Sequence, residues 1–217
     1  MSFPVVVLIS GSGSNLQALI DQCLQGELNI EIKAVISNQA DAYGLERARL
    51  AGIPAISVSH KDYASRELFD LALQAEIDQF QPKLVVLAGF MRILTEGFTR
   101  HFEGRMLNIH PSLLPKFKGL NTHQRAIDAK ESQHGVSVHF VSAELDAGAV
   151  VLQASTDIEA QDTAESLAHK IHSLEHIIYP LAVKWFSEAR LSYQAGKTWL
   201  DHQALPPTGV MYQANLK

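Results

Sequence analysis

Residues 5–15 read VVVLISGSGSN, and this stretch determines the fold class that the sequence predicts. Its first five residues are continuously apolar and β-branched or leucine, which is typical of a strand buried on both faces of a parallel sheet. Glycines and serines then form a turn, and the apolar residues between Leu16 and Leu24, Cys23 among them, follow the spacing of an amphipathic helix. A strand, a glycine turn and a helix in this order begin a βαβ unit.

The rest of the chain continues this alternation. Expected strands are 30–37, 55–58, 84–88, 105–109, 136–141 and 150–154, and expected helices are 42–51, 62–79 and 162–186. We therefore expect an α/β fold with a doubly wound, mostly parallel, Rossmann-like sheet in residues 1–186. Residues 187–217 have strand-like and turn-like pieces without a clear core, and we expect them to form a C-terminal appendage packed on the same domain.

Composition excludes several classes of protein. The 217 residues are 47% hydrophobic and 19% charged, which excludes a disordered chain. A formal net charge of -5 argues against a nucleic-acid partner. The longest uncharged apolar run, 84–91, is too short to span a membrane, and the only cysteine, Cys23, suits a reducing compartment. We expect a cytoplasmic protein with no membrane partner, either a monomer or a homodimer.

The glycine turn is a candidate anion site, because a turn before a helix N-terminus directs backbone N–H groups outward. Leu16 stands where the dinucleotide fingerprint needs its third glycine, and no Gly-Lys-Ser/Thr follows, so neither NAD nor ATP is implied. We predict a phosphate monoester site, in which the two glycines permit close approach and the polar side chains donate. A tight turn that binds nothing is the alternative. The residues concerned are Gly11, Ser12, Gly13, Ser14 and Asn15.

Asn108 and His110 stand two residues apart at the end of an expected strand, so both side chains lie on one face. Ligands of parallel sheets bind beyond the carboxyl ends of the strands. An amide donor beside an imidazole suits stabilisation of an oxyanion and proton transfer. Asp146, in a turn between two strands, could stabilise a charged imidazole. The alternatives are a buried Asn and His that bind loop backbone, and a surface Asp in its turn.

Six ordered segments carry a resemblance that covers essentially the whole chain. The chain resembles the phosphoribosylglycinamide formyltransferase family, which belongs to the folate-dependent formyltransferases. The matching segments are VLISGSGSN at 7–15, SN at 37–38, LAGFMRIL at 87–94, NIHPSLLP at 108–115, HGVSVH at 134–139 and ELDAG at 144–148.

The resemblance implies formyl transfer from 10-formyltetrahydrofolate, as co-substrate, to the glycyl amine of glycinamide ribonucleotide in purine biosynthesis. It implies that Asn108 and protonated His110 stabilise a tetrahedral intermediate, with Asp146 assisting. It also implies that the glycine loop holds the ribotide phosphate and that Glu175 contacts the amine. The folate-binding residues that it implies are Arg66, Met91, Arg92, Ile93, Leu94, Asn108 and Val141.

Two departures from the family concern the ribotide contacts. Asn121 stands where many relatives have a second histidine, and His172 stands where relatives often have Gln or Lys. The segment from His172 to His176 also fits the inverted zinc-protease pattern H-x-x-E-H. We expect no metal there, because a third ligand should lie well downstream and only 41 residues follow His176.

Three other functions compete with this interpretation. Methionyl-tRNA formyltransferases add a basic C-terminal domain, whereas here about 30 residues follow the core and the net charge is negative. Formyltetrahydrofolate hydrolases add an N-terminal regulatory domain, whereas here the first strand begins at Pro4. A non-catalytic module for phosphorylated metabolites would keep the glycine loop but would not need Asn108, His110 and Asp146 together.

Overall fold

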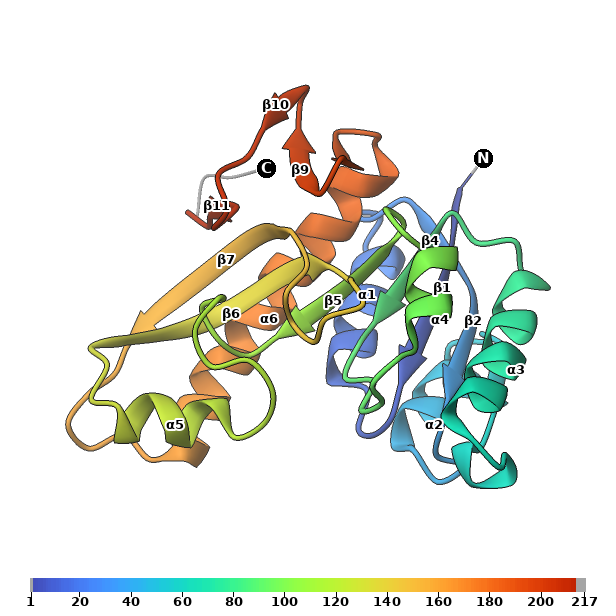
Figure 1. Cartoon of the computed structure of the whole chain (residues 1–217), viewed down its shortest axis with the longest axis horizontal. Helices are drawn as coiled ribbons and strands as arrows, with labels where there is room; N and C mark the ends of the chain where they lie inside the picture. The colour runs from blue at the N-terminus through green and yellow to red at the C-terminus, as the bar shows by residue number, and fades with distance from the viewer. Residues whose placement is uncertain (1, 214–217) are drawn as a thin grey trace. The chain divides into compact units, whose positions relative to one another are not determined.

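Strand β1 (Phe3–Ile9) forms the middle of the sheet in the first of two units, Met1–Asn108 and Ile109–Lys217. The structure is a computed structural model that describes residues 2–213. Each side chain from Val5 to Ile9 is fully buried, as expected for a strand covered on both faces. Strand β1 pairs in parallel with two neighbours, β2 (Ile30–Ser37) and β4 (Leu84–Leu87), and Figure 1 shows these strands side by side.

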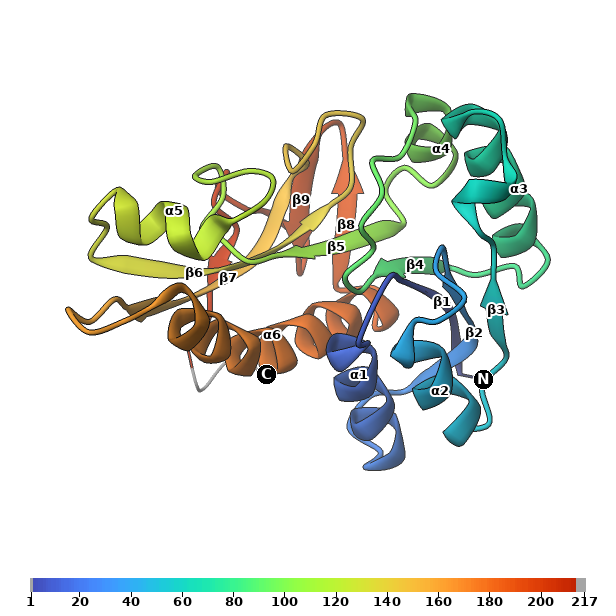
Figure 2. The same ribbon diagram turned by 90° about the horizontal axis from the view of Figure 1, so that it is seen from below.

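The sheet of the first unit is parallel throughout. Its order is β5-β4-β1-β2-β3, with β3 at Ala55–Ser57 and β5 at Met106–His110, whose last two residues belong to the second unit. Helices α1 and α2 cover one face, and α3 and α4 cover the other (Figure 2), which confirms the doubly wound α/β class. The helices of this unit are α1 (Ser14–Leu24), α2 (Tyr43–Leu50), α3 (Arg66–Asp78) and α4 (Glu96–His101), with a 3₁₀ turn at His60–Asp62.

The predicted apolar stripe of α1 is correct except at its end. Leu16, Leu19 and Ile20 are buried, and Cys23 is half-buried. Leu24, which the periodicity placed on the same stripe, is 81% exposed. The helix ends at this residue, so the periodic pattern extends one residue beyond the surface that α1 covers.

The second unit departs from the all-parallel pattern. Strands β6 (Gln133–Phe140) and β7 (Val150–Asp157) are antiparallel, because nine residues join them and a parallel pair needs a longer crossover. Helix α6 (Ala164–Ser187) packs along this pair (Figure 2), and α5 (Thr122–Asp128) contacts α6. The sequence did not predict α4 or α5, which have six and seven residues, too few for a clear apolar period.

The last part of the described chain adds two small sheet elements. Strands β8 (Leu191–Gln194), β9 (Lys197–Leu200) and β10 (Gln203–Ala204) form an antiparallel sheet of their own. Strand β11 (Val210–Met211) pairs in parallel with the edge of β7. None of the helices within residues 2–213 is both long and apolar enough to cross a bilayer.

Gly209 allows β11 to approach β7. Its φ is 66°, and a Cβ built on it would lie 2.6 Å from the backbone of Val151. We expect Gly209→Ala to lower the free energy of unfolding by at least about 1 kcal/mol more than Gly196→Ala does. Both substitutions place alanine at a left-handed φ, but only the Cβ at position 209 would clash with a neighbouring backbone. Urea unfolding of the two variants measures this difference. Equal losses of stability would contradict the close packing of β11 on β7.

Candidate active site

The end of β5 presents the predicted pair Asn108 and His110. The two residues are two positions apart on one strand, so their side chains lie on the same face. His110 is 6% exposed, and Asn108 is half-buried.

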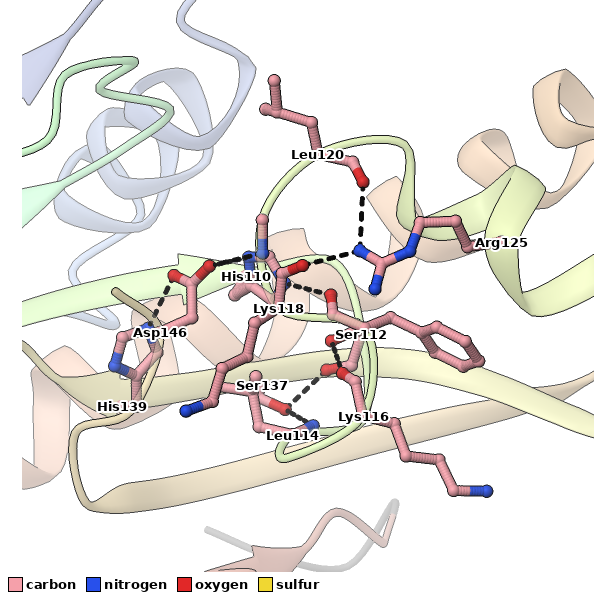
Figure 3. Close-up of polar contacts among 12 residues, drawn as sticks. His110, Ser112, Leu114, Lys116, Lys118, Leu120, Arg125, Ser137, His139 and Asp146 are labelled. Carbon is pink, nitrogen blue, oxygen red and sulfur yellow. Dashed lines mark hydrogen bonds and ion pairs between the residues drawn. The ribbon is translucent and has the colours of Figure 1, made fainter. Parts of the chain in front are cut away.

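The imidazole of His110 lies between two oxygen atoms (Figure 3). Its Nε2 is 2.9 Å from the carbonyl oxygen of Phe117, and its Nδ1 is 3.4 Å from Oδ2 of Asp146. A carbonyl can only accept, so Nε2 carries the proton and donates it. When Nδ1 is protonated as well, both N–H groups of the imidazolium face an acceptor.

The carboxylate of Asp146 is held in place by its own turn and by a backbone N–H group of another loop. Its own φ is 49°, and its Oδ2 accepts a hydrogen bond of 2.9 Å from the N–H of Gly119. Its carboxylate is 7% exposed, although the residue lies in a turn that the sequence also allowed to be a surface feature. The structure therefore brings Asp146 to His110, as the resemblance implied.

A second histidine, His139 of β6, lies on the other side of Asp146. Burial lowers the pKa of His139 to about 4, so this imidazole is neutral near pH 7. Its Nδ1 donates to the carbonyl of Phe140 at 2.8 Å, and its Nε2 is 3.8 Å from Oδ1 of Asp146. Asp146 therefore has an imidazole on each side, and the nitrogen of His110 is the closer of the two, at 3.4 Å against 3.8 Å.

Two further histidines lie close together in the same unit. Nδ1 of His123 on α5 is 3.1 Å from Nε2 of His134 on β6. Burial lowers the pKa of His134 to about 4, and the neighbouring His123 acts in the same direction. Burial also lowers the pKa of His123, and the nearby His172 of α6 lowers it further.

The glycine loop lies in the first unit, before α1. Gly11 and Ser12 are exposed, and nothing lies within 4 Å of a Cβ built on Gly11. Gly13 differs: it is buried with a φ of 71°, and its Cβ would lie 2.7 Å from Cα of Gly44 in α2. Gly11 is thus open to an approaching anion, whereas packing against α2 is enough to require glycine at position 13. Ser14 begins α1, and Asn15 is buried.

The residues that the resemblance assigned to folate lie on several elements. Met91 and Ile93 are 69% and 55% exposed, whereas Leu94 is buried. Arg66 is the first residue of α3 and is half-exposed. Its Nε lies 4.0 Å from Oε1 of Glu67.

Met91, Arg92, Ile93 and Leu94 lie in a loop between β4 and α4, residues 89–95, which hydrogen bonds hold within the first unit. The N–H of Met91 donates to Oγ of Ser10 at 2.7 Å, and the N–H of Thr95 donates to Oδ2 of the buried Asp70 at 2.6 Å. Burial raises the pKa of Asp70. Arg92 places its guanidinium 5.9 Å from the ring centre of Phe69 on α3.

The remaining predicted residues belong to the second unit. Val141 follows β6 and is half-buried, and Glu175 is a 5% exposed residue of α6. Within residues 2–213, no three His, Cys, Asp or Glu side chains lie so that they could bind one metal ion, and this includes the H-x-x-E-H segment of α6.

Sequence reasoning missed the Phe117 contact and the environment of His139. Phe117 contributes its carbonyl, and a backbone group leaves no signal in the pattern of side chains. His139 stood in a segment that matched the family, but only the fold shows that it flanks Asp146.

Comparisons with known proteins agree on one family. The family model described as Formyl transferase matches residues 4–183. The phosphoribosylglycinamide formyltransferase of Escherichia coli K12 is 51% identical over 205 residues, which are 94% of this chain and 97% of that protein. The human trifunctional purine biosynthetic protein adenosine-3 is 45% identical over 180 residues, 83% of this chain but 18% of that protein.

Solved structures give the same result. The phosphoribosylglycinamide formyltransferase of Coxiella burnetii is 52% identical with a TM-score of 0.94, over 98% of this chain and 100% of the other. A formyltetrahydrofolate deformylase from Pseudomonas syringae is 25% identical with a TM-score of 0.86, over 92% of this chain and 66% of the other.

The buried neutral histidines predict how stability depends on pH. His134 and His139 bind a proton only near pH 4 when folded, but near pH 6.5 when unfolded. The unfolded state therefore holds more protons between these values, and stability should fall as the pH is lowered through this window. Each histidine adds a slope of about 1.4 kcal/mol per pH unit.

We expect His134→Gln to reduce the slope of stability against pH by about 1.4 kcal/mol per pH unit, the contribution of one histidine. Urea unfolding at a series of pH values between about pH 7 and pH 4.5 measures this slope. Val138→Ala is the control, since it removes buried apolar atoms without a titratable group. It should lower stability equally at every pH. A wild-type slope in His134→Gln would contradict the assignment of a neutral, buried His134.

Proposed function

Because the chain belongs to the formyl transferase family, we propose that Asn108, His110 and Asp146 carry out its reaction. The enzyme transfers the formyl group of 10-formyltetrahydrofolate to the glycyl amine of glycinamide ribonucleotide, a step of purine biosynthesis. The observation that carries the assignment is the position of the His110 imidazole, between the carbonyl of Phe117 and the carboxylate of Asp146.

The two contacts of His110 suggest a role for each nitrogen. The Nε2–H bond to Phe117 has an ordinary length, so it orients the ring throughout the reaction. The 3.4 Å between Nδ1 and Asp146 exceeds the roughly 2.7–3.2 Å of a good N–H···O bond. The Nδ1–H of the imidazolium is therefore the donor that remains available to a substrate oxygen placed near it.

In the proposed reaction, the amine nitrogen bonds to the formyl carbon and the carbonyl electron pair moves to its oxygen. The Asn108 amide and the Nδ1–H of His110 stabilise this oxyanion, a kind of interaction worth about 3 kcal/mol of barrier per donor. Asp146 stabilises the imidazolium and receives the amine proton through water. The intermediate then collapses: the bond from carbon to the folate nitrogen breaks, and that nitrogen takes the proton.

We propose the same division of binding residues that the resemblance implied. The open Gly11 and Ser12, with Gly13, Ser14 and Asn15, would hold the ribotide phosphate at the start of α1. Glu175 would contact the amine of the ribotide.

The proposed folate contacts come mainly from the 89–95 loop. Its exposed Met91 and Ile93 suit apolar contact with the pterin. The full proposed folate set is Arg66, Met91, Arg92, Ile93, Leu94, Asn108 and Val141.

We further propose that the enzyme works in the cytoplasm as a monomer or homodimer. The single cysteine, half-buried in α1, suits a reducing compartment.

A second candidate function is hydrolysis of formyltetrahydrofolate, which the likeness to the Pseudomonas syringae deformylase raises. Water would then replace the amine as the acceptor. A turnover assay with 10-formyltetrahydrofolate decides between them. We expect rapid formyl transfer when glycinamide ribonucleotide is present, and formate release without it would favour the deformylase.

We predict that His110→Ala lowers kcat by about 10²–10⁴-fold, because the imidazole acts on charge that develops in the transition state. Folate affinity should stay within about tenfold, or about 1.4 kcal/mol. Steady-state kinetics and calorimetry with a folate analogue test both parts. Turnover within a few-fold of wild type would remove His110 from the mechanism.

We also predict that Gly11→Val raises the Kd for glycinamide ribonucleotide at least about tenfold and leaves the folate Kd within about twofold. A Cβ at this position meets nothing within 4 Å, so we expect the added side chain to obstruct an incoming phosphate more than the fold. Gly97→Val is the matched control, because its Cβ is equally free and lies on α4. Equal weakening of both ligands would show that the loop shapes the unit without binding phosphate.

A further inference from the structure

One rung of the β6–β7 ladder is polar in an otherwise apolar stretch. Ser137 lies directly opposite Gln153, so their side chains share one face. The adjacent rungs pair Val136 with Ala154 and Val138 with Leu152. Ser137 and Gln153 are 0% and 3% exposed, so each polar atom at this rung needs a partner inside the protein.

Both side chains bind the loop that follows β5. Gln153 Nε2 donates to the carbonyl of Leu114 at 3.0 Å and to Oγ of Ser137 at 2.8 Å. Ser137 Oγ donates to the carbonyl of Ser112 at 2.6 Å and accepts from the N–H of Leu114 at 3.0 Å (Figure 3). The Ser137 hydroxyl thus donates one hydrogen bond and accepts two, which is its full capacity.

The loop passes this constraint on to His110. The hydroxyl of Ser112, itself fully buried, donates to the carbonyl of Lys116 at 2.7 Å, and the N–H of Ser112 donates to the carbonyl of His110 at 2.8 Å. The next residue, Phe117, has a φ of 54°, which is unfavourable for a non-glycine residue and needs support from its surroundings. It is the carbonyl of Phe117 that accepts from His110 Nε2.

We infer that Gln153 is a positioning residue for formyl transfer: together with Ser137 it holds the 112–117 loop, which sets the orientation of the His110 imidazole. Gln153 acts through the loop and has no role at the reacting atoms. An apolar residue could fill the same space, but it would leave the Leu114 carbonyl without its donor. A fully satisfied buried network fixes one geometry, and a partly satisfied one loosens it. The inference rests on the proposed role of His110.

The test compares Gln153→Met with Val138→Ala. Methionine keeps the length of the side chain and removes the donor, while Val138→Ala destabilises β6 at the neighbouring rung without touching the network. We expect Gln153→Met to lower kcat about 10–100-fold with both KM values within about threefold. Val138→Ala should keep kcat within about twofold.

A measurement without turnover follows the imidazole directly. The ¹⁵N resonances of His110, assigned by their loss in His110→Ala, report which nitrogen carries the proton and how it is hydrogen-bonded. We expect the Nε2 signal to move in Gln153→Met and to stay in place in Val138→Ala. An unmoved signal together with a wild-type kcat would overturn the inference.

Two further results separate the inference from its premise. If His110→Ala remained active, the proposed mechanism would fail, while the Nε2 signal would still show whether Gln153 holds the ring. If Gln153→Met did not fold, Ser137→Ala would carry the same test, because it removes one hydroxyl from the same network. The double variant Gln153→Met/Ser137→Ala should lose no more kcat than the more severe of the two single variants. Additive losses of kcat would contradict a shared network.

Discussion

The arrangement of the loops around the candidate site follows one constraint: each nitrogen of the buried His110 imidazole needs a polar partner inside the protein. A buried donor without a partner costs about 1–3 kcal/mol, and a buried unpaired charge costs more. The acceptors are the carbonyl of Phe117 and the carboxylate of Asp146, which come from two different loops. Holding both loops takes further hydrogen bonds, from Gly119 to Asp146 and from the Ser137–Gln153 rung to the loop that ends at Phe117. These hydrogen bonds thus hold the two partners of the His110 ring in place.

The sequence predicts the first unit well because the signals there are local. Continuous apolar runs such as Val5–Ile9 indicate buried parallel strands, and the helix after the glycine turn needs only its own periodicity. The site depends on contacts between residues far apart in the chain. Asn108 and His110 are recognisable because they share one strand, but Asp146 lies 36 positions after His110, and only the fold brings it within 3.4 Å. Backbone partners such as the Phe117 carbonyl carry no sequence signal at all.

The glycine loop places two glycines, two positions apart, in different surroundings. Gly11 is exposed with open space around it, whereas Gly13 is buried against Gly44 in a left-handed conformation. The sequence alone cannot distinguish open space at Gly11 from close packing at Gly13, because both positions simply lack a Cβ. The surroundings leave Gly11 open, as the proposed phosphate site requires, and they explain Gly13 by the close packing of α1 and α2. A substitution at Gly13 therefore disturbs folding and binding together.

Three histidines in the second unit are almost equally buried, yet the structure gives them different chemistry. Burial lowers the pKa of both His134 and His139 to about 4, and the neighbouring His123 adds to the effect at His134. His110 alone among these three has a carboxylate oxygen 3.4 Å from one nitrogen and a carbonyl at the other. Burial by itself favours the neutral form of an imidazole. The proposed role of His110 rests on this carboxylate, whose other oxygen lies 3.8 Å from the neutral His139.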